Sequence, residues 1–236
     1  MSLLWPESIQ LRIGPDALRV VRRRQAALEM PLAADWAASL ASLPGLPRFA
    51  GLHVTVADRH ARYLRLNWPA GLKAAERQAF VDHRFQSVFG DGPWTSLADR
   101  DAFGRTSLAA ALPAGLPLAL KAWARARSLR IATIEPAFVA DYRRHCAGFR
   151  GDGAFACLEA GRVTLGLWSA GQWRAVRSQP VDSADAGAAA RCLSALLPAL
   201  PVEDLFAAGT LHLAGATPSV DLLPAGWTCA GLKDAP

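Results

Sequence analysis

The sequence lacks the features of membrane-spanning, secreted and disordered chains. None of its apolar runs approaches the roughly 18–20 residues that cross a bilayer. The first seven residues contain no basic stretch followed by an apolar core, so we expect no secretory signal. Only 19% of the 236 residues are charged and 52% are hydrophobic, which excludes a disordered protein and is enough for one sizeable domain or two small lobes. The 19 glycines and 16 prolines are dispersed, which excludes collagen-like and low-complexity classes.

Cysteine and lysine are also scarce. The cysteines form no C-x-x-C pair, which predicts reduced thiols in the cytosol rather than a disulfide frame or a zinc site: Cys146, Cys157, Cys192 and Cys229. The five histidines show no metal-ligand spacing, so we expect no metal and no cofactor. Only three of the 26 basic residues are lysines, so the net charge of +6 resides on arginine, which favours bidentate contacts with carboxylates and phosphates.

Short strands and helices alternate in the first half of the chain. Polar and apolar residues alternate on either side of the turn at residues 14–16, which predicts a hairpin over residues 8–22. A second hairpin is expected over residues 52–66, with its turn at residues 57–60. Helical spacing and breaker residues predict helices over residues 31–43, 72–89, 117–127 and from 136 through 145, with strands at 93–97, just before 104 and at 129–134.

The pattern of the first half returns in outline in the second. After a glycine-containing loop at residues 149–153, a three-strand meander is expected over residues 154–178. A helix over residues 184–197 and a strand over residues 210–214 follow, and the tail gives few further signals. Because strands precede helices in both halves, we predict an α/β or α+β chain of two related lobes with a boundary near residues 148–153.

Two glycine turns between predicted strands are candidate phosphate sites, because such turns present backbone N–H groups. They lie at residues 13–16 and 159–162. Neither turn is followed directly by a helix, as the Walker and Rossmann fingerprints require, and Pro15 removes a donor from the first. Ordinary hairpin turns are therefore favoured at both positions.

Other candidates for catalysis are weaker still. The chain has no G-x-S-x-G nucleophile motif. His83 on a predicted helix and His212 within a predicted strand are expected to be solvated and packed, respectively. Several acidic residues stand at turns and helix starts, where they are expected to cap: Asp35, Asp58, Asp91, Asp182 and Asp185.

Basic residues gather in three places. Arg22, Arg23 and Arg24 are consecutive, and two further groups are formed by Lys121, Arg125, Arg127 and Arg130 and by Arg143 and Arg144. These groups are either solvated faces or a surface that docks an anionic partner protein or the inner membrane leaflet. Nucleic acid is not expected, because aromatic residues for base stacking are not interleaved with the basic ones.

Trp68 is the tryptophan expected to be exposed, because it ends a strand immediately before Pro69. An exposed indole at this position would suit a peptide-binding groove. Trp68, Arg22, Arg23 and Arg24 are therefore the candidate partner-binding residues.

The segment Leu52–Pro69, which has a strand, a short turn, a second strand and a Trp-Pro ending, resembles actin-like bacterial pilus and secretion assembly proteins. These are the PilM proteins of type IV pilus assembly and the cytoplasmic part of GspL of type II secretion. The strand and proline of Ile131–Pro136 and the end of the meander, Gly171–Ser178, resemble further parts of the same proteins.

The resemblance implies an actin-like ATPase (ribonuclease H-like) α/β fold of reduced size, with two lobes that each hold a mixed sheet and flanking helices. It places a first lobe with an inserted subdomain at residues 1–150 and a second lobe at residues 151–236. It also implies a cytoplasmic scaffold at the inner face of the bacterial inner membrane, peripheral to that membrane. The implied partner is the cytoplasmic segment of a single-pass assembly protein (PilN-like or GspM-like), with a secretion ATPase as a further partner.

The sequence departs from that family where actin-like ATPases hold metal and nucleotide. Their first strand ends in Asp-x-Gly, and Arg12 stands where the aspartate would fall. Cys157 or Leu158 stands at the matching position of the second lobe, and residues 214–216 replace the Gly-Gly of the adenosine side. An arginine cannot supply the oxygen ligand that Mg²⁺ requires. We therefore expect a pseudo-ATPase that is not an enzyme.

Two other classes of function are compatible with the sequence. An active nucleotide-dependent enzyme of the same fold, an ATPase or a small kinase, predicts saturable binding of ATP with Mg²⁺. A basic nucleic-acid-binding domain predicts an affinity that falls steeply with salt.

Overall fold

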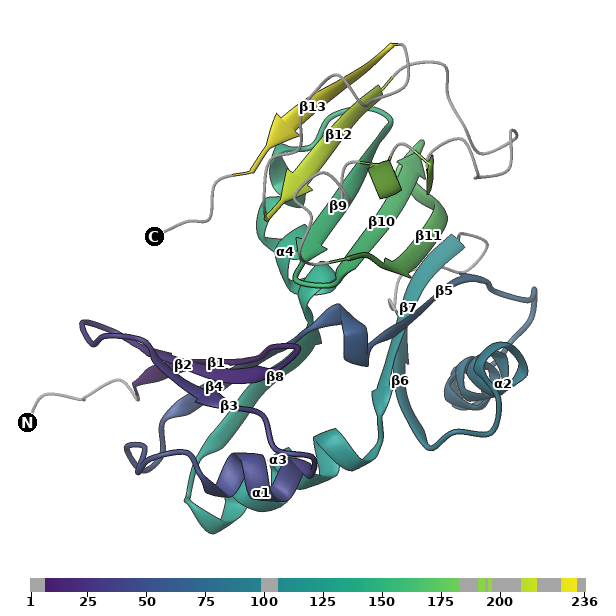
Figure 1. Ribbon diagram of the computed structural model, residues 1–236. Coiled ribbons are helices and arrows are strands. Elements are labelled where there is room, and N and C mark those ends of the chain that lie inside the picture. Colours follow the sequence, from purple (N-terminus) through teal and green to yellow (C-terminus); the bar gives the residue numbers. More distant parts are fainter. Residues whose placement is uncertain are drawn as a thin grey trace, which may run out of the picture.

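The computed structural model describes residues 7–98, 106–182, 191–193, 195–196, 209–215 and 226–232. Its first sheet has the strand order β3-β2-β1-β4-β8 (Figure 1). The strands are β1 (Ser8–Ile13), β2 (Ala17–Arg22), β3 (Leu28–Pro31), β4 (Gly51–Val56) and β8 (Arg130–Pro136). β2 and β3 run antiparallel to their neighbours, whereas β1, β4 and β8 are parallel. Their carboxyl ends therefore lie at one edge of the sheet.

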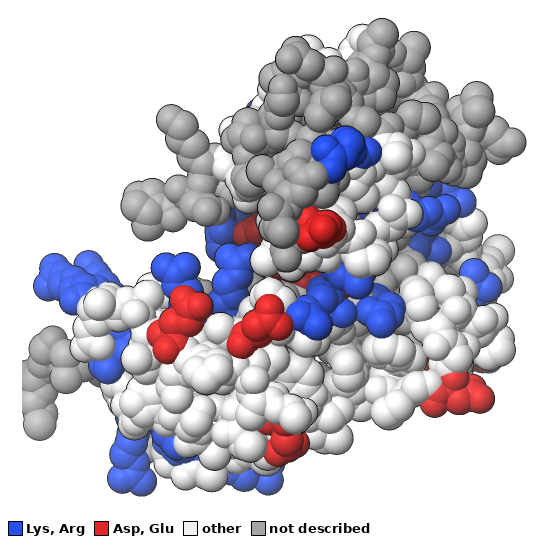
Figure 2. Space-filling view, in the orientation of Figure 1, with Lys and Arg blue, Asp and Glu red and all other residues white. Residues whose placement is uncertain are grey.

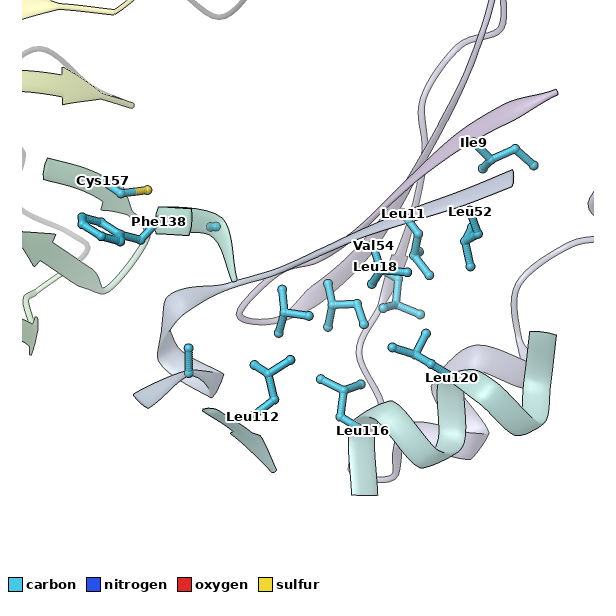
Figure 3. Close-up of a cluster of buried hydrophobic side chains, with 14 of the residues drawn as sticks. Ile9, Leu11, Leu18, Leu52, Val54, Leu112, Leu116, Leu120, Phe138 and Cys157 are labelled. Atoms are coloured by element: carbon cyan, nitrogen blue, oxygen red, sulfur yellow. The ribbon is translucent and has the colours of Figure 1, made fainter. Parts of the chain in front are cut away.

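One face of the first sheet is the core face. The alternation in β1 buries Ile9, Leu11 and Ile13 and leaves the residues between them exposed. Two helices, α1 (Trp36–Ala41) and α3 (Gly115–Ala126), cover the buried face. Figure 3 shows leucines of α3 pointing at those of the strands: Leu116 and Leu120 lie opposite Leu11, Leu18, Leu52 and Val54. The other face of β1 carries polar side chains, among them Arg12.

A smaller sheet is inserted between β4 and β8. Its strands are β5 (Arg62–Asn67), β6 (Trp94–Ala98) and β7 (Thr106–Pro113), in the order β5-β7-β6, and all pairs are antiparallel. The helix α2 (Arg77–Phe89), preceded by the short helix η2 (Ala74–Glu76), packs on this sheet and ends at Gly90 with a φ of 81°. Val81 and Phe85 supply its buried positions.

The second sheet repeats the topology of the first. Its order is β11-β10-β9-β12-β13, with strands β9 (Gly153–Glu159), β10 (Arg162–Ser169), β11 (Gln172–Pro180), β12 (Gly209–Ala214) and β13 (Trp227–Gly231). In each sheet an antiparallel meander of three strands is followed by two strands parallel to the first. The division of the chain at residue 150 stays a prediction, and β9, the first strand of the second sheet, begins at Gly153.

Helix α4 (Ala137–His145) and the short helix η3 (Cys146–Gly148) connect the two sheets (Figure 1). Aromatic rings fill the space between α4 and the second sheet. Tyr142 of α4 lies 4.7 Å from the Trp173 ring centroid, and Phe138 lies 5.1 Å from that of Phe155. His212 stacks on Phe149 at 4.0 Å, so this histidine is packed as expected. The core is therefore continuous from the first sheet through α4 to the second.

The second hairpin expected from the sequence is wrong. β4 pairs with β1 and β8 in the first sheet, whereas β5 pairs with β7 in the small sheet. The turn between them is the short helix η1 (Asp58–His60), which redirects the chain instead of folding β5 back on β4. Two runs of alternating residues beside a turn satisfy the local hairpin pattern, but the strand partners are set by distant residues.

Other differences concern element ends and short strands. The helix expected at residues 31–43 begins only at Trp36, because residues 28–31 form β3 at the sheet edge. β7 and β13 gave no signal in the sequence, and the helix expected at residues 184–197 and the strand expected before residue 104 lie largely outside the described residues. Within the described ranges, no helix combines the length and the apolar character that a bilayer crossing requires.

Candidate functional site

The carboxyl ends of β1 and β4 meet the end of β9, where the first sheet approaches the second (Figure 1). In α/β proteins, ligands commonly bind outside the carboxyl ends of parallel strands. Four side chains converge there: Arg12, Asp58, Tyr63 and Glu159. We call them the Asp58 site.

Asp58 is the buried centre of this site. It lies two residues after the end of β4, is 1% exposed and is the first residue of η1. Its Oδ1 accepts a hydrogen bond from the hydroxyl of Tyr63 at 2.5 Å and one from the backbone N–H of Phe138 at 3.1 Å. Phe138 lies in the first turn of α4, so the carboxyl group of Asp58 satisfies one of the free N–H groups of that helix.

The environment of Asp58 favours its neutral form. Burial and, after it, the negative charge of Glu159 together raise the pKa of Asp58 from 3.8 to about 7, while the hydrogen bonds from Tyr63 and Phe138 oppose the rise. Oδ2 of Asp58 is buried and has no hydrogen-bond partner among the described residues. An oxygen in that position is less costly to bury when the carboxyl group holds a proton.

Glu159 joins the second sheet to the first through both of its carboxylate oxygens. Oε1 accepts from the guanidinium of Arg12 at 3.1 Å, and Oε2 accepts from the backbone N–H of Asp58 at 2.6 Å. The Glu159 side chain is 5% exposed and that of Arg12 is 50% exposed. The ion pair therefore lies at the rim of the contact between the sheets, with the carboxylate on the buried side.

Two further groups face this site from α4 and β9. The Cys157 thiol is 3.7 Å from Oδ2 of Asp141, and burial raises the pKa of that thiol well above its usual value, so the thiol is neutral at physiological pH. Asp141 also forms an ion pair with Arg144 at 2.9 Å. Burial lowers the pKa of the Arg12 guanidinium, but the charge and hydrogen bond of Glu159 and, after them, the charge of Asp141 raise it above its usual value.

These residues do not fit a magnesium–nucleotide complex. Mg²⁺ needs carboxylate, phosphate or water oxygens in octahedral geometry. The Glu159 oxygens and Oδ1 of Asp58 already accept hydrogen bonds from the protein, and a guanidinium stands beside them. Within the described part of the chain, no three His, Cys, Asp or Glu side chains are grouped so that they could hold a metal ion.

The turns on either side of the site are tight hairpin turns. The N–H of Gly14 donates to the carbonyl of Ala17 at 2.7 Å, so this group is not free to bind phosphate. A shallow pocket of about 290 Å³ beside the turn carries both signs of charge, from Arg12, Arg19 and Glu29.

On the second sheet, Gly215 has a φ of 99° and a Cβ there would clash with the carbonyl of Leu158, so this glycine serves close strand packing.

Trp68 is less exposed than the sequence indicates. Its indole N–H donates to the hydroxyl of Ser107 at 2.7 Å, and its ring lies 5.6 Å from that of Phe80. The side chain is half-buried against the core of the small sheet, so the expectation of a free indole is wrong. The strand β7, which supplies Ser107, gave no signal in the sequence. Partner binding by the remaining exposed edge of Trp68 stays a prediction.

The three consecutive arginines lie far from Trp68 in the fold. Arg22 ends β2 and forms a two-pronged ion pair with Glu7, with nitrogen–oxygen distances of 2.9 and 3.1 Å. Arg23 and Arg24 follow in the exposed β2–β3 turn. The structure therefore places these arginines at one end of the first sheet and Trp68 on the small sheet, so they do not form one groove (Figure 1).

Asp58, Tyr63 and Glu159 are the site residues that sequence reasoning missed. The sequence predicts a capping role for Asp58, like that of Asp35 at α1, where Oδ2 of Asp35 accepts from the N–H of Ala38 at 3.0 Å. The available signal is position: Asp58 lies two residues after a buried strand whose parallel neighbour ends beside it. Arg12, in contrast, is noted in the sequence as standing where the family has an aspartate, and it lies one residue before the end of β1.

The sequence matches no protein-family model and no curated protein. Solved structures, however, match over most of the chain. A Bacteroides thetaiotaomicron protein with an actin-like ATPase fold and unknown function has a TM-score of 0.61 at 10% identity, with 92% of this chain and 85% of that chain covered. The cytoplasmic domain of EpsL, an inner membrane component of the type II secretion system of Vibrio cholerae, has a TM-score of 0.57 at 12% identity, with 96% and 90% covered.

The PilM–PilN type IV pilus biogenesis complex has a TM-score of 0.56 at 13% identity, with 88% of this chain and 81% of that chain covered. These likenesses establish the actin-like fold of the chain, in a reduced size of 236 residues. The fold predicted from the sequence is confirmed, and so is the structural likeness to PilM and to the cytoplasmic domain of the secretion component.

Proposed function

We propose that this protein is a non-catalytic scaffold of a pilus or secretion assembly, and that it binds the cytoplasmic segment of a membrane-anchored partner at the inner face of the bacterial inner membrane. The Arg12–Glu159 ion pair carries the non-catalytic part of this proposal. It puts a guanidinium and an occupied carboxylate at the carboxyl ends of β1 and β9, where the two halves of an actin-like fold would face a nucleotide.

The ion pair acts against nucleotide binding in two ways. A triphosphate with Mg²⁺ needs oxygen ligands, and the oxygens of Glu159 are already hydrogen-bonded to Arg12 and to the N–H of Asp58. Opening the site would separate the Glu159 carboxylate from its cation while it remains largely buried, which is unfavourable. The site is therefore suited to hold the sheets together.

The fold of the relatives supports a partner role. One matching structure is a complex of PilM with PilN, and another is the cytoplasmic domain of an inner membrane component. We extend this kind of partner to the present chain, with a PilN-like or GspM-like protein as the partner and a secretion ATPase as a further candidate. Trp68 is the residue we propose to test first, because its half-exposed ring borders an aromatic cluster.

The competing function is that of a nucleotide-dependent enzyme. The actin-like fold favours it, because proteins of this fold include ATPases. The residues at the Asp58 site favour the scaffold instead, for the reasons of ligand chemistry given above.

The test uses the full chain and a synthetic peptide. The peptide copies the cytoplasmic N-terminal segment of a single-pass membrane protein encoded beside this one, and a scrambled peptide of the same composition is the control. We expect saturable binding of the first peptide only, weakened by Trp68→Ala and less by Trp68→Phe, which keeps an aromatic ring. Absence of binding, together with hydrolysis of ATP by the chain, would contradict the proposal.

A further inference from the structure

The end of the first sheet opposite the Asp58 site is formed by three turns. They are the β2–β3 turn, the loop before β4 and the turn between α3 and β8 (Figure 1). Sheet register brings them together, because Arg22 lies opposite Ile9, and Ser8 lies opposite Gly51, which pairs with Arg130. The N–H of Phe49 donates to the carbonyl of Ser128 at 2.6 Å and links two of the turns. We call this end the basic end.

Five exposed arginines lie at or next to the basic end: Arg23, Arg24, Arg48, Arg125 and Arg130. None of their side chains makes an ion pair or hydrogen bond within the part of the chain that the structure describes. By contrast, two neighbouring arginines bind other groups of the protein. Arg22 pairs with Glu7, and Arg127 donates to the carbonyls of Ala41, Leu43 and Pro44. At this end, two arginines therefore contact other parts of the protein, and the side chains of five are exposed to solvent.

Figure 2 agrees with this distribution. Blue side chains lie along the left and lower left margins of the view, where Figure 1 places the β2–β3 turn and the start of β8, and no red group lies at the left margin itself. Of the acidic residues beside the β2–β3 turn, Glu7 forms an ion pair with Arg22, and Glu29 lies on β3 opposite Arg19. The basic end therefore presents a positive surface to its surroundings.

Phe49, which follows Arg48 in the loop before β4, is exposed at the basic end. Its side chain is 64% exposed, and its φ of 64° is a left-handed conformation that a bulky residue rarely adopts. Glycine would remove both the strain and the exposed apolar area. Arg24 and Ser128, with φ values of 62° and 55°, put the same conformation into the other two turns. A strained, exposed aromatic ring among free cations points to a ligand outside the chain.

We propose that the basic end docks on the surface of an anionic phospholipid bilayer, with the arginines at the headgroups and the Phe49 ring in the interface. Charge complementarity points to an anionic lipid surface, because each arginine near such a surface adds to the binding free energy. The Phe49 ring adds a separate hydrophobic contribution to that binding. The residues come from turns and from the adjoining ends of α3 and β8, all at one end of the first sheet. Nucleic acid would call for several stacking rings, and the basic end offers one.

This inference deepens the proposed function, since it gives the scaffold a membrane-facing side. The basic end is formed by the amino ends of β1, β4 and β8, and the Asp58 site lies at their carboxyl ends. A protein docked in this way turns the Asp58 site and the second sheet away from the lipid. Lipid binding is measured without any partner protein, so it can fail while partner docking stands, and the reverse also holds.

Co-sedimentation of the full chain with vesicles tests the inference. One set is phosphatidylcholine alone and the other contains about one part in three of phosphatidylglycerol. We expect binding to the anionic vesicles at about 0.1 M salt, and its loss at about 0.5 M, where charges are screened over a few ångströms. Equal binding to both vesicle sets, or none to either, overturns the proposal.

Variants assign the binding to the basic end. Arg23→Gln with Arg24→Gln is expected to lower the partition coefficient about thirtyfold. The matched control, Lys73→Gln with Arg84→Gln, removes the same charge from exposed positions around α2 and is expected to leave it unchanged. Phe49→Gly should lower it about tenfold while the unfolding temperature stays equal or rises, because glycine suits this φ. An equal loss in the control pair, or retention of an acidic peptide or DNA in place of vesicles, contradicts the proposal.

Discussion

The guanidinium of Arg12 donates to Oε1 of Glu159 at 3.1 Å and so joins β1 of the first sheet to β9 of the second, across 147 positions of the chain. The same carboxylate accepts the N–H of Asp58, so one side chain of the second sheet is held by two groups of the first. The contact between the sheets is therefore polar at its rim, and it adjoins the aromatic rings around α4.

Removing Arg12 is expected to destabilise the fold. Arg12→Gln leaves the largely buried carboxylate of Glu159 without its cation and beside Asp58, and we expect a loss of about 1–2 kcal/mol in the free energy of unfolding. Arg59→Gln is the control, because the Arg59–Asp16 pair is exposed on both sides and its loss should cost less than about 0.5 kcal/mol. Urea denaturation measures both, and equal effects would contradict a special role for Arg12.

Asp58 makes stability depend on pH in a direction that is unusual for an aspartate. Burial raises its pKa to about 7 in the folded protein, whereas an unfolded aspartate has a pKa of about 3.9. Between these values the folded state binds the extra proton, so the contribution of Asp58 to stability is fully present below pH about 4 and is lost as the pH rises through about 7.

Asp58→Asn removes this titration and keeps an acceptor for Tyr63 and Phe138. We expect the variant to gain about 1–3 kcal/mol relative to the native protein between pH 5 and pH 8, because the native protein loses that amount on ionisation. Denaturation curves at several pH values measure the difference, with Asp16→Asn as an exposed control. A difference that is constant across this range would refute the raised pKa.

The hydroxyl of Tyr63 is expected to lower the pKa of Asp58, in addition to the packing of its ring in the core. Tyr63→Phe removes the hydroxyl donor to Oδ1, at a cost of about 1–2 kcal/mol. Since that bond lowers the pKa of Asp58, its loss should move the pH midpoint upward. In an Asp58→Asn background, the pH midpoint of stability should be absent, and Tyr63→Phe should reduce the free energy of unfolding by less. A double-mutant cycle measures this difference. An unchanged midpoint in the single variant would contradict the coupling.

Gly166 is expected to tolerate no side chain. A Cβ there would lie 2.5 Å from the Trp173 ring and 2.7 Å from that of Phe138, which pack between α4 and the second sheet. We expect Gly166→Ala to cost about 1–3 kcal/mol by overpacking and to alter the near-ultraviolet circular dichroism of the tryptophans. Gly148→Ala, with no atom within 4 Å of the new Cβ, is the control and should be close to neutral.

Local patterns predicted the elements whose partners are neighbours in sequence. The β1–β2 hairpin and the meander of β9, β10 and β11 each combine alternation with a glycine turn, and both are present. β4 and β5 show the same local pattern, yet they join different sheets, because β1 and β7 supply the paired edges. β3 and β13 are short edge strands, which carry little periodic signal.

The residues of the candidate site also differ in whether the sequence indicates them. Arg12 was recognisable because it ends a strand at a position where the family resemblance expects a carboxylate. The contact of Asp58 with Glu159 joins residues 101 positions apart, and no local pattern encodes the approach of the two sheets. The burial that raises the pKa of Asp58 likewise depends on α4 and β5, which pack around it from both sides.

Isothermal titration of the full chain with ATP and Mg²⁺ tests the central claim most directly. The account predicts no saturable binding at millimolar nucleotide, because the Arg12–Glu159 pair and the hydrogen-bonded carboxyl groups leave Mg²⁺ without ligands. Saturable, Mg²⁺-dependent binding that weakens in a Glu159→Gln variant would contradict it, since the carboxylate would then act as part of a nucleotide site.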